Sequence, residues 1–131
     1  MIFFKLILIF LLFSFSVNAD QKDFRLDNLF SILSKTESDE EINRITSSIW
    51  DIWLETNDPS INMDFYYGLE SMRSGDLKMS VKFFTKVINK NSNFAEAWNK
   101  RATVYYLLGD FDLSMIDINE TLKLEPRHFG A

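Results

Sequence analysis

Few residues in this sequence could perform chemistry. His128 is the only histidine and there is no cysteine, which excludes zinc sites built on these ligands and cysteine–histidine nucleophilic pairs. The carboxylate pairs Glu40–Glu41 and Asp110–Asp112 fall at expected helix starts, where negative charge complements the helix dipole. We interpret them as structural and not as acid–base catalysts. The sequence therefore predicts no enzyme, no catalytic residue, no metal site and no cofactor.

The remaining polar candidates also have a structural interpretation. His128 is expected to be a surface or packing residue, with contact to a partner's carboxylate or pH sensing as the alternative. Ser80 and Ser114 have no histidine base nearby in the sequence to activate them, so they are interpreted as packing residues. The four glycines are too scattered for a phosphate-binding loop. No small-molecule substrate is expected.

Net charge restricts the class of partner. The chain carries 14 basic and 19 acidic residues, a formal charge of −5. Such a surface repels phosphate, and no basic run is interleaved with aromatic residues to form a stacking platform. We therefore expect neither nucleic acid nor an anionic membrane surface as a partner.

Residues 1–19 are typical of a secretory signal peptide. Lys5 precedes an apolar run from Leu6 to Val17, and Ala19 offers a small residue for cleavage. The run is shorter than the roughly 20 residues of a transmembrane helix. We predict an exported, periplasmic protein, with an uncleaved leader and an inner-membrane anchor as the alternative.

Apolar residues then recur three and four positions apart, the period of a helical face. Ser38 and Glu41 have the spacing of a capping box, and so do Asn93 and Glu96. The wide apolar sector of the second helix predicts packing on two sides. The expected helices are 20–35, one starting at 38–41, 62–74, 77–90, 94–108 and 111–124.

An offset of 34 residues aligns the last four helices as two copies of one unit. It pairs Gly75-Asp76 with Gly109-Asp110 and Ser80 with Ser114. Glycine at these two positions can adopt the left-handed conformation that ends a helix. Small residues at positions 68, 80, 102 and 114 would let paired helices approach closely. A helical period of this length is typical of tetratricopeptide arrays.

The second copy resembles the tetratricopeptide repeat family. Trp98, Ala102, Tyr105, Ser114 and Pro126 match its pattern, whereas the first copy departs from it at positions 64, 71 and 92. The stretch 95–131 also resembles exported bacterial members that carry WNKRA and LEPRHFGA blocks. The resemblance implies an all-α, right-handed superhelix of antiparallel helix pairs. It divides the chain into a signal peptide (1–19), a degenerate helix pair (20–58), and two repeats (about 61–94 and 95–128) with the start of a third (59–131 in all).

The resemblance also implies that the first helix of each pair lines a concave groove for a protein or peptide partner. A carboxylate clamp is not expected, because Phe65 and Leu69 occupy slots that it would need polar. Arg101 stands where the family has leucine, so it forms either an intramolecular ion pair or a contact with an acidic partner. The candidate groove residues are Asn62, Phe65, Leu69, Met72, Arg73, Glu96, Asn99, Arg101, Thr103 and Tyr106.

Phe129, Gly130 and Ala131 fall where a third repeat would begin. Either the sequence is a truncated product, or a partner or second copy covers the face of the helix 111–124. We predict a scaffold that binds another protein. The alternatives are a docking or regulatory segment of a longer exported enzyme, and a membrane-anchored adaptor.

Overall fold

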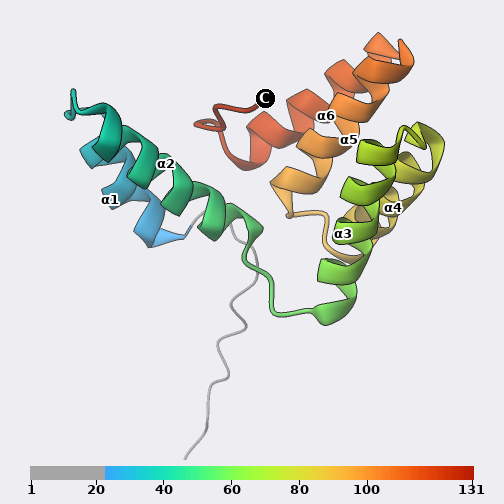
Figure 1. Ribbon diagram of the computed structural model, residues 1–131, viewed down its shortest axis with the longest axis horizontal. Helices are drawn as coiled ribbons and strands as arrows, with labels where there is room; N and C mark the ends of the chain where they lie inside the picture. The colour runs from blue at the N-terminus through green and yellow to red at the C-terminus, as the bar shows by residue number, and fades with distance from the viewer. Residues whose placement is uncertain (1–22) are drawn as a thin grey trace, which may run out of the picture.

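The computed structural model describes residues 23–131, which form helices and no strand. The expected leader and the first residues of the first expected helix lie outside this part of the chain. The expected all-helical class is confirmed for the described residues. The helices are α1 (Phe24–Leu33), α2 (Asp39–Leu54), α3 (Pro59–Ser74), α4 (Leu77–Lys90), α5 (Ala95–Leu108) and α6 (Phe111–Leu124) (Figure 1).

Acidic side chains begin several helices. Asp23, Asp58 and Asp76 each accept a hydrogen bond from a backbone N–H in the first turn of α1, α3 and α4. Pro59 lies inside the first turn of α3, where its missing N–H costs nothing. The third helix therefore begins earlier than the expected start at Asn62.

The capping box at the start of α2 forms, but Thr36 replaces the direct hydrogen bond between the Glu41 carboxylate and the Ser38 N–H. The Ser38 hydroxyl accepts from the Glu41 N–H at 3.4 Å, as the spacing predicted. The return bond runs through Thr36, whose hydroxyl accepts from the Ser38 N–H at 3.3 Å and donates to Glu41 Oε2 at 2.5 Å.

The expected capping box between Asn93 and Glu96 is wrong. Phe94 is the N-cap of α5 and makes no side-chain capping bond. The Asn93 N–H donates to Asn91 Oδ1 at 3.0 Å. The Glu96 carboxylate bonds instead to Asn99 and Lys100 of α5 and to His128 near the end of the chain.

Each of the last two helix pairs turns at a glycine. Gly75 and Gly109 have φ of +83° and +81°, the left-handed conformation that the Gly-Asp pairs predicted. Within each pair a buried serine joins the two helices. Ser80 Oγ donates to the Gly68 carbonyl at 2.8 Å, and Ser114 Oγ donates to the Ala102 carbonyl at 2.9 Å. This repetition confirms the close-packing role expected for both serines.

The two pairs pack against each other through α4 and α5. Their shared core contains the buried residues Ile61, Phe65, Phe84, Val87, Ile88, Phe94, Ala97 and Val104. A separate core, formed by Leu26, Ile45, Ile49, Ile52 and Trp53, joins α1 to α2. None of the helices between residues 23 and 131 combines the length and hydropathy that a bilayer crossing needs.

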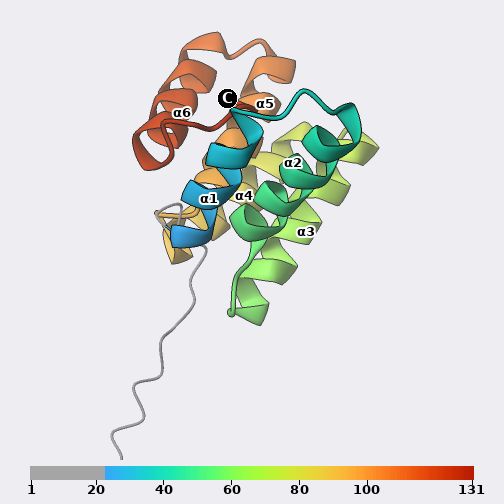
Figure 2. The same cartoon turned by 90° about the vertical axis from the view of Figure 1, so that its left-hand side faces the viewer.

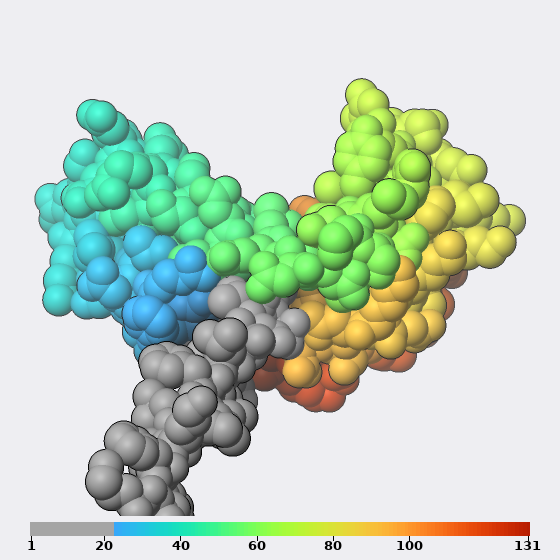
Figure 3. All heavy atoms as spheres, turned by 90° about the horizontal axis from the view of Figure 1, so that it is seen from below, coloured from blue at the N-terminus to red at the C-terminus, as the bar shows by residue number. Residues whose placement is uncertain are grey.

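The α1–α2 pair does not pack mainly against the α3–α4 pair, which follows it in the sequence. Outside its own pair, α2 mainly contacts α5 and the segment that follows α6. Figures 1 and 2 both place the C-terminus beside the α1–α2 pair. The expected two-sided packing of α2 is confirmed, but its second neighbour comes from the far end of the chain. Between the α1–α2 and α3–α4 pairs the surface is hollowed (Figure 3).

Candidate protein-docking site

In the first repeat, the next helix along the chain, α5, packs on the outer face of the second helix, α4. Phe84 of α4 is fully buried, and Phe65 of α3 lies 5.1 Å from the ring of Phe94, which precedes α5. Ala97 and Val104 of α5 complete this core. An entire helix therefore covers the face of the α3–α4 pair.

The equivalent face of the α5–α6 pair is not covered by a helix in the described part of the chain. The 34-residue offset matches α4 residues Leu77, Val81, Phe84 and Ile88 with Phe111, Met115, Ile118 and Leu122. Of the latter, Phe111 is 58% exposed, Met115 54% and Leu122 36%. All eight residues are apolar although no pair is identical, so α6 presents an apolar face like the one that receives α5.

The segment after α6 follows the backbone pattern of the segment before α5. The His128 N–H donates to the Glu125 carbonyl at 3.1 Å, as the Phe94 N–H does to the Asn91 carbonyl at 3.2 Å. The next bond is also repeated, from Ala131 to His128 and from Ala97 to Phe94. The chain thus approaches the open face along the path by which residues 91–97 lead into α5.

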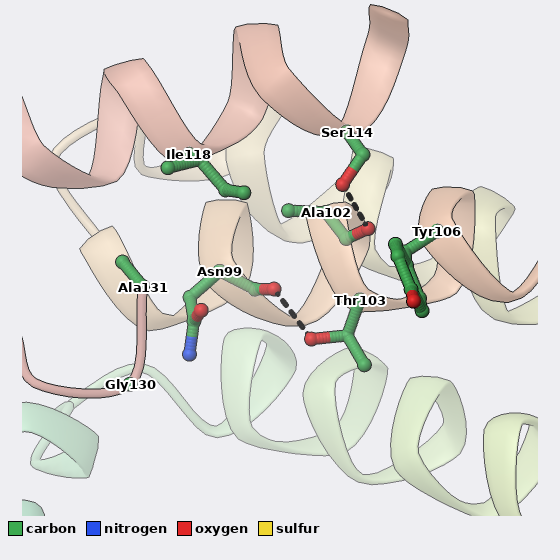
Figure 4. A pocket seen from close by; sticks show the side chains of 8 residues that line it. All are labelled: Asn99, Ala102, Thr103, Tyr106, Ser114, Ile118, Gly130 and Ala131. Atoms are coloured by element: carbon green, nitrogen blue, oxygen red, sulfur yellow. Dashed lines mark hydrogen bonds between the residues drawn. The ribbon is translucent and has the colours of Figure 1, made fainter. Parts of the chain in front are cut away.

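A pocket of about 170 Å³ lies at this position (Figure 4). Its walls come from α5, α6 and the last two residues of the sequence. They are Asn99, Ala102, Thr103, Tyr106, Ser114, Ile118, Gly130 and Ala131. We call this pocket, together with the row Phe111, Met115, Ile118 and Leu122, the α6 seat.

The candidate groove residues of α3 do not share one open surface. Phe65 is 8% exposed within the core, and Leu69 and Met72 pack against that core. The seated α5 accounts for this burial. Arg73 is exposed and pairs with Glu70 at 2.5 Å, and Asn62 donates to the Thr56 carbonyl at 3.3 Å.

Three candidates from α5 come together in the α6 seat. Asn99, Thr103 and Tyr106 line its pocket, and Tyr106 is 63% exposed. The Thr103 hydroxyl donates to the Asn99 carbonyl at 3.1 Å (Figure 4). The pocket therefore offers an exposed aromatic ring within a mainly apolar surface.

Arg101 points elsewhere and forms an intramolecular pair, one of its two expected roles. Its Nε and Nη2 donate to the two carboxylate oxygens of Asp117 at 2.7 and 2.8 Å, and Nη1 donates to Thr85 Oγ1 at 3.0 Å. Burial lowers the pKa of the Arg101 guanidinium, but the Asp117 carboxylate outweighs it and holds that pKa above its ordinary value. Arg101 thereby ties α5 to both α4 and α6.

A polar cluster that the sequence did not predict adjoins the pocket through Asn99. His128 Nε2 lies 3.0 Å from Glu96 Oε2, which also accepts from Asn99 Nδ2 at 3.0 Å, and Lys100 Nζ lies 2.9 Å from Glu96 Oε1. Burial raises the pKa of Glu96, but His128, Lys100 and Asn99 together hold it below its ordinary value. The 34-residue offset places His128 at the position of buried Phe94, a signal from which its burial could have been predicted.

The same segment fastens the N-terminal pair. The His128 ring stacks on Trp53 at 4.3 Å with an interplanar angle of 6°, and Phe129 lies 5.0 Å from Trp53. Arg127 donates to Asp27 of α1 at 2.7 Å and to buried Glu125 at 2.9 Å. We call residues 125–129 the C-terminal clasp. The C-terminal clasp contacts α1 through Arg127 and α2 through His128 and Phe129, and the two residues that follow it line the α6 seat.

Within residues 23–131, no cluster of three or more histidine, aspartate or glutamate side chains is arranged to hold a metal ion. The polar groups near the α6 seat are instead engaged with one another. The arrangement suits the docking of a helix or peptide.

Comparison with known proteins supports the repeat architecture. A TPR repeat-containing protein of Rhizobium etli is 32% identical over 107 residues, covering 82% of this chain and 52% of the relative. This similarity supports a tetratricopeptide repeat family. The chain spans about half the length of this curated relative. No family model and no solved structure matches the chain significantly.

The WNKRA and LEPRHFGA blocks are not established as family markers by this comparison. The name of this relative gives only its type of repeat, and helical-repeat solenoids as a class form extended concave surfaces.

Proposed function

We propose that this protein is an exported scaffold that binds a helix of another protein in the α6 seat. The proposal rests on a comparison of the two repeats within the molecule. The face of the α3–α4 pair receives α5, and the equivalent face of the α5–α6 pair is also apolar, is largely exposed and ends in a pocket. We expect the docked helix to continue the right-handed stacking of the repeats.

Two exposed residues of α6 provide a matched test. Met115 is 54% exposed and belongs to the α6 seat, whereas Ile116 is 55% exposed and lies outside its apolar row. Lysine at position 115 should disrupt docking because a charge would have to be buried against apolar surface. We expect Met115→Lys to abolish recovery of the partner from an envelope extract, and Ile116→Lys to leave it unchanged. Equal recovery by both variants would reject the α6 seat.

A covalent extension tests the geometry without knowledge of the partner. Because residues 128–131 follow the path of 94–97, a copy of residues 98–108 added after Ala131 should continue as a helix into the seat. We expect this extension to raise the melting temperature and to protect α6 amides from exchange. Met115→Lys should remove both gains. An extension that remains unprotected would contradict the proposed geometry.

The relative's greater length supports a second candidate function. In this alternative, the chain is a docking or regulatory segment of a longer exported enzyme, and the helix in the α6 seat belongs to the same polypeptide. The reading frame downstream of the Ala131 codon distinguishes the two. Further repeats or a catalytic domain would favour the alternative, and a stop codon would favour the scaffold.

Export is tested by the mass of the mature protein. A start at Asp20 would support cleavage of the leader and a periplasmic location. An intact leader would favour the adaptor anchored in the inner membrane.

A further inference from the structure

The outer side of the α3–α4 pair has a charge opposite to that of the whole chain. Residues 59–90 contain five basic and three acidic side chains, whereas the complete sequence has 14 basic and 19 acidic. All four charged side chains of α4 are lysines: Lys78, Lys82, Lys86 and Lys90. A protein that repels anions elsewhere therefore presents a basic helix here.

The nearby acidic groups do not neutralise this helix. Asp64 pairs with Lys90 at 2.7 Å, Glu70 pairs with Arg73, and Asp76 caps α4 through the Met79 N–H. Among residues 23–131, Lys78, Lys82 and Lys86 have no ion-pair partner. They recur every four residues, so they form a row along α4 with steps of about 6 Å.

Aromatic and thioether side chains border this row. Phe83 lies under the Lys86 ammonium, which is 4.9 Å from its ring centre, and beside Tyr67 at 5.4 Å. Tyr67 and Met79 are 46% and 39% exposed. A hollow of about 320 Å³ lies between the lysines, lined by Met79, Val81, Lys82, Phe83, Thr85 and Lys86. Exposed tyrosine, phenylalanine and methionine are enriched at protein interfaces.

We propose that this α4 basic face binds an acidic amphipathic helix of a partner protein. Carboxylates at every fourth position of a helix match the lysine steps, and apolar residues on the adjacent stripe of the same helix can enter the hollow. An extended segment fits less well, because its alternate residues point to opposite sides. The α4 basic face is separate from the α6 seat and does not depend on it.

The test uses the whole protein and a labelled synthetic helix of about 18 residues with glutamate at every fourth position and leucine on the adjacent stripe. We expect saturable binding that weakens as salt is raised. Lys82→Glu/Lys86→Glu should weaken binding about tenfold or more. The matched control, Lys35→Glu/Lys123→Glu, makes the same change in net charge on other surfaces and should bind normally. Amide chemical shifts should move at residues 78–90 and at Tyr67, and not at 103–122.

Several outcomes would overturn the proposal. They are equal binding by the two double variants, equal binding of a peptide with lysine in place of glutamate, and shift changes confined to α5 and α6. Sedimentation with phosphatidylglycerol vesicles, without binding of the acidic peptide, would assign the surface to a membrane and also reject the proposal. Met115→Lys should bind the acidic peptide unchanged, which separates this site from the α6 seat.

Discussion

Glu96 stabilises the protein from a position where an unpaired carboxylate would be costly. It is 1% exposed, and its carboxylate contacts three polar side chains. They are Asn99 and Lys100 of α5 and His128 of the C-terminal clasp. Because these partners hold its pKa below the ordinary value of 4.5, the ionised form is favoured in the folded state. The clasp is therefore attached to α5 through a group whose charge depends on pH.

The stability contributed by Glu96 should be lost in acid. A carboxylate with a lowered folded-state pKa stabilises above its unfolded pKa, and this contribution disappears as the pH falls through the folded-state value. We expect Glu96→Gln to lower the free energy of unfolding at pH 7 by about 1–3 kcal/mol. The difference from the parent should shrink below pH 4.5, the ordinary value. Urea unfolding across this range measures it, with Glu40→Gln, an exposed carboxylate, as the control. A constant difference at every pH would contradict the assignment.

Arg101 and Asp117 should behave as one unit. Their side chains are 14% and 2% exposed, so removal of the arginine alone leaves a buried carboxylate without its partner. We expect Arg101→Met to cost about 3–5 kcal/mol in the free energy of unfolding. Replacement of both, Arg101→Met with Asp117→Leu, should cost less than the single change because neither charge remains. Additive effects in urea unfolding would show that the pair is not coupled.

At the scale of elements, the two repeats fill one equivalent contact between their paired helices with side chains of different sizes. Gly68 lies against Phe84, and a Cβ at position 68 would approach the ring to 2.7 Å. One repeat later the corresponding residues are Ala102 and Ile118, which line one pocket. A smaller residue on one helix is thus matched by a larger one on its neighbour.

This compensation predicts coupled substitutions. Gly68→Ala alone should lower the free energy of unfolding by about 1–3 kcal/mol, because the fully buried Phe84 ring has little room to move. Adding Phe84→Ile reproduces the combination of the second pair. We expect the double variant to lose less free energy of unfolding than the sum of the losses in the two single variants. Thermal unfolding of the three variants measures the coupling, and simple additivity would contradict it.

Local signals predicted most of these elements. Period, caps and the Gly-Asp turns are encoded by neighbouring residues, so helix ends at Gly75 and Gly109 and the cap at Ser38 could be predicted. The start of α3 lies before the expected Asn62 because Pro59 fits the first turn of a helix, where its missing N–H costs no hydrogen bond. The expected cap at Asn93 does not form, because its N–H donates to Asn91 and the Glu96 carboxylate bonds within α5 and to the distant His128.

Whole-molecule contacts were the least predictable part of the structure. The 34-residue offset describes contacts between successive repeats, but α1 and α2 depart from that pattern and contact the end of the chain instead. Likewise, Phe65, Leu69 and Met72 share a face in sequence, but only the seated α5 decides that this face is core. Asn99, Thr103 and Tyr106 lie one repeat later and line the pocket, where Thr103 and Tyr106 remain exposed and Asn99 is buried.

The C-terminal clasp should therefore hold the two ends of the molecule together. His128→Ala removes both the stack on Trp53 and the bond to Glu96, while the core within α1–α2 stays intact. We expect faster amide exchange in α1 and α2, with little change in α3 and α4, because local opening depends on the contacts that are broken. Hydrogen exchange with mass spectrometry measures this difference. Phe24→Ala is the control, since Phe24 is 83% exposed. Unchanged protection of α2 in His128→Ala would mean that its contact with α5 is sufficient to hold the pair, whereas selective loss in α1 and α2 would show that the C-terminal clasp holds them.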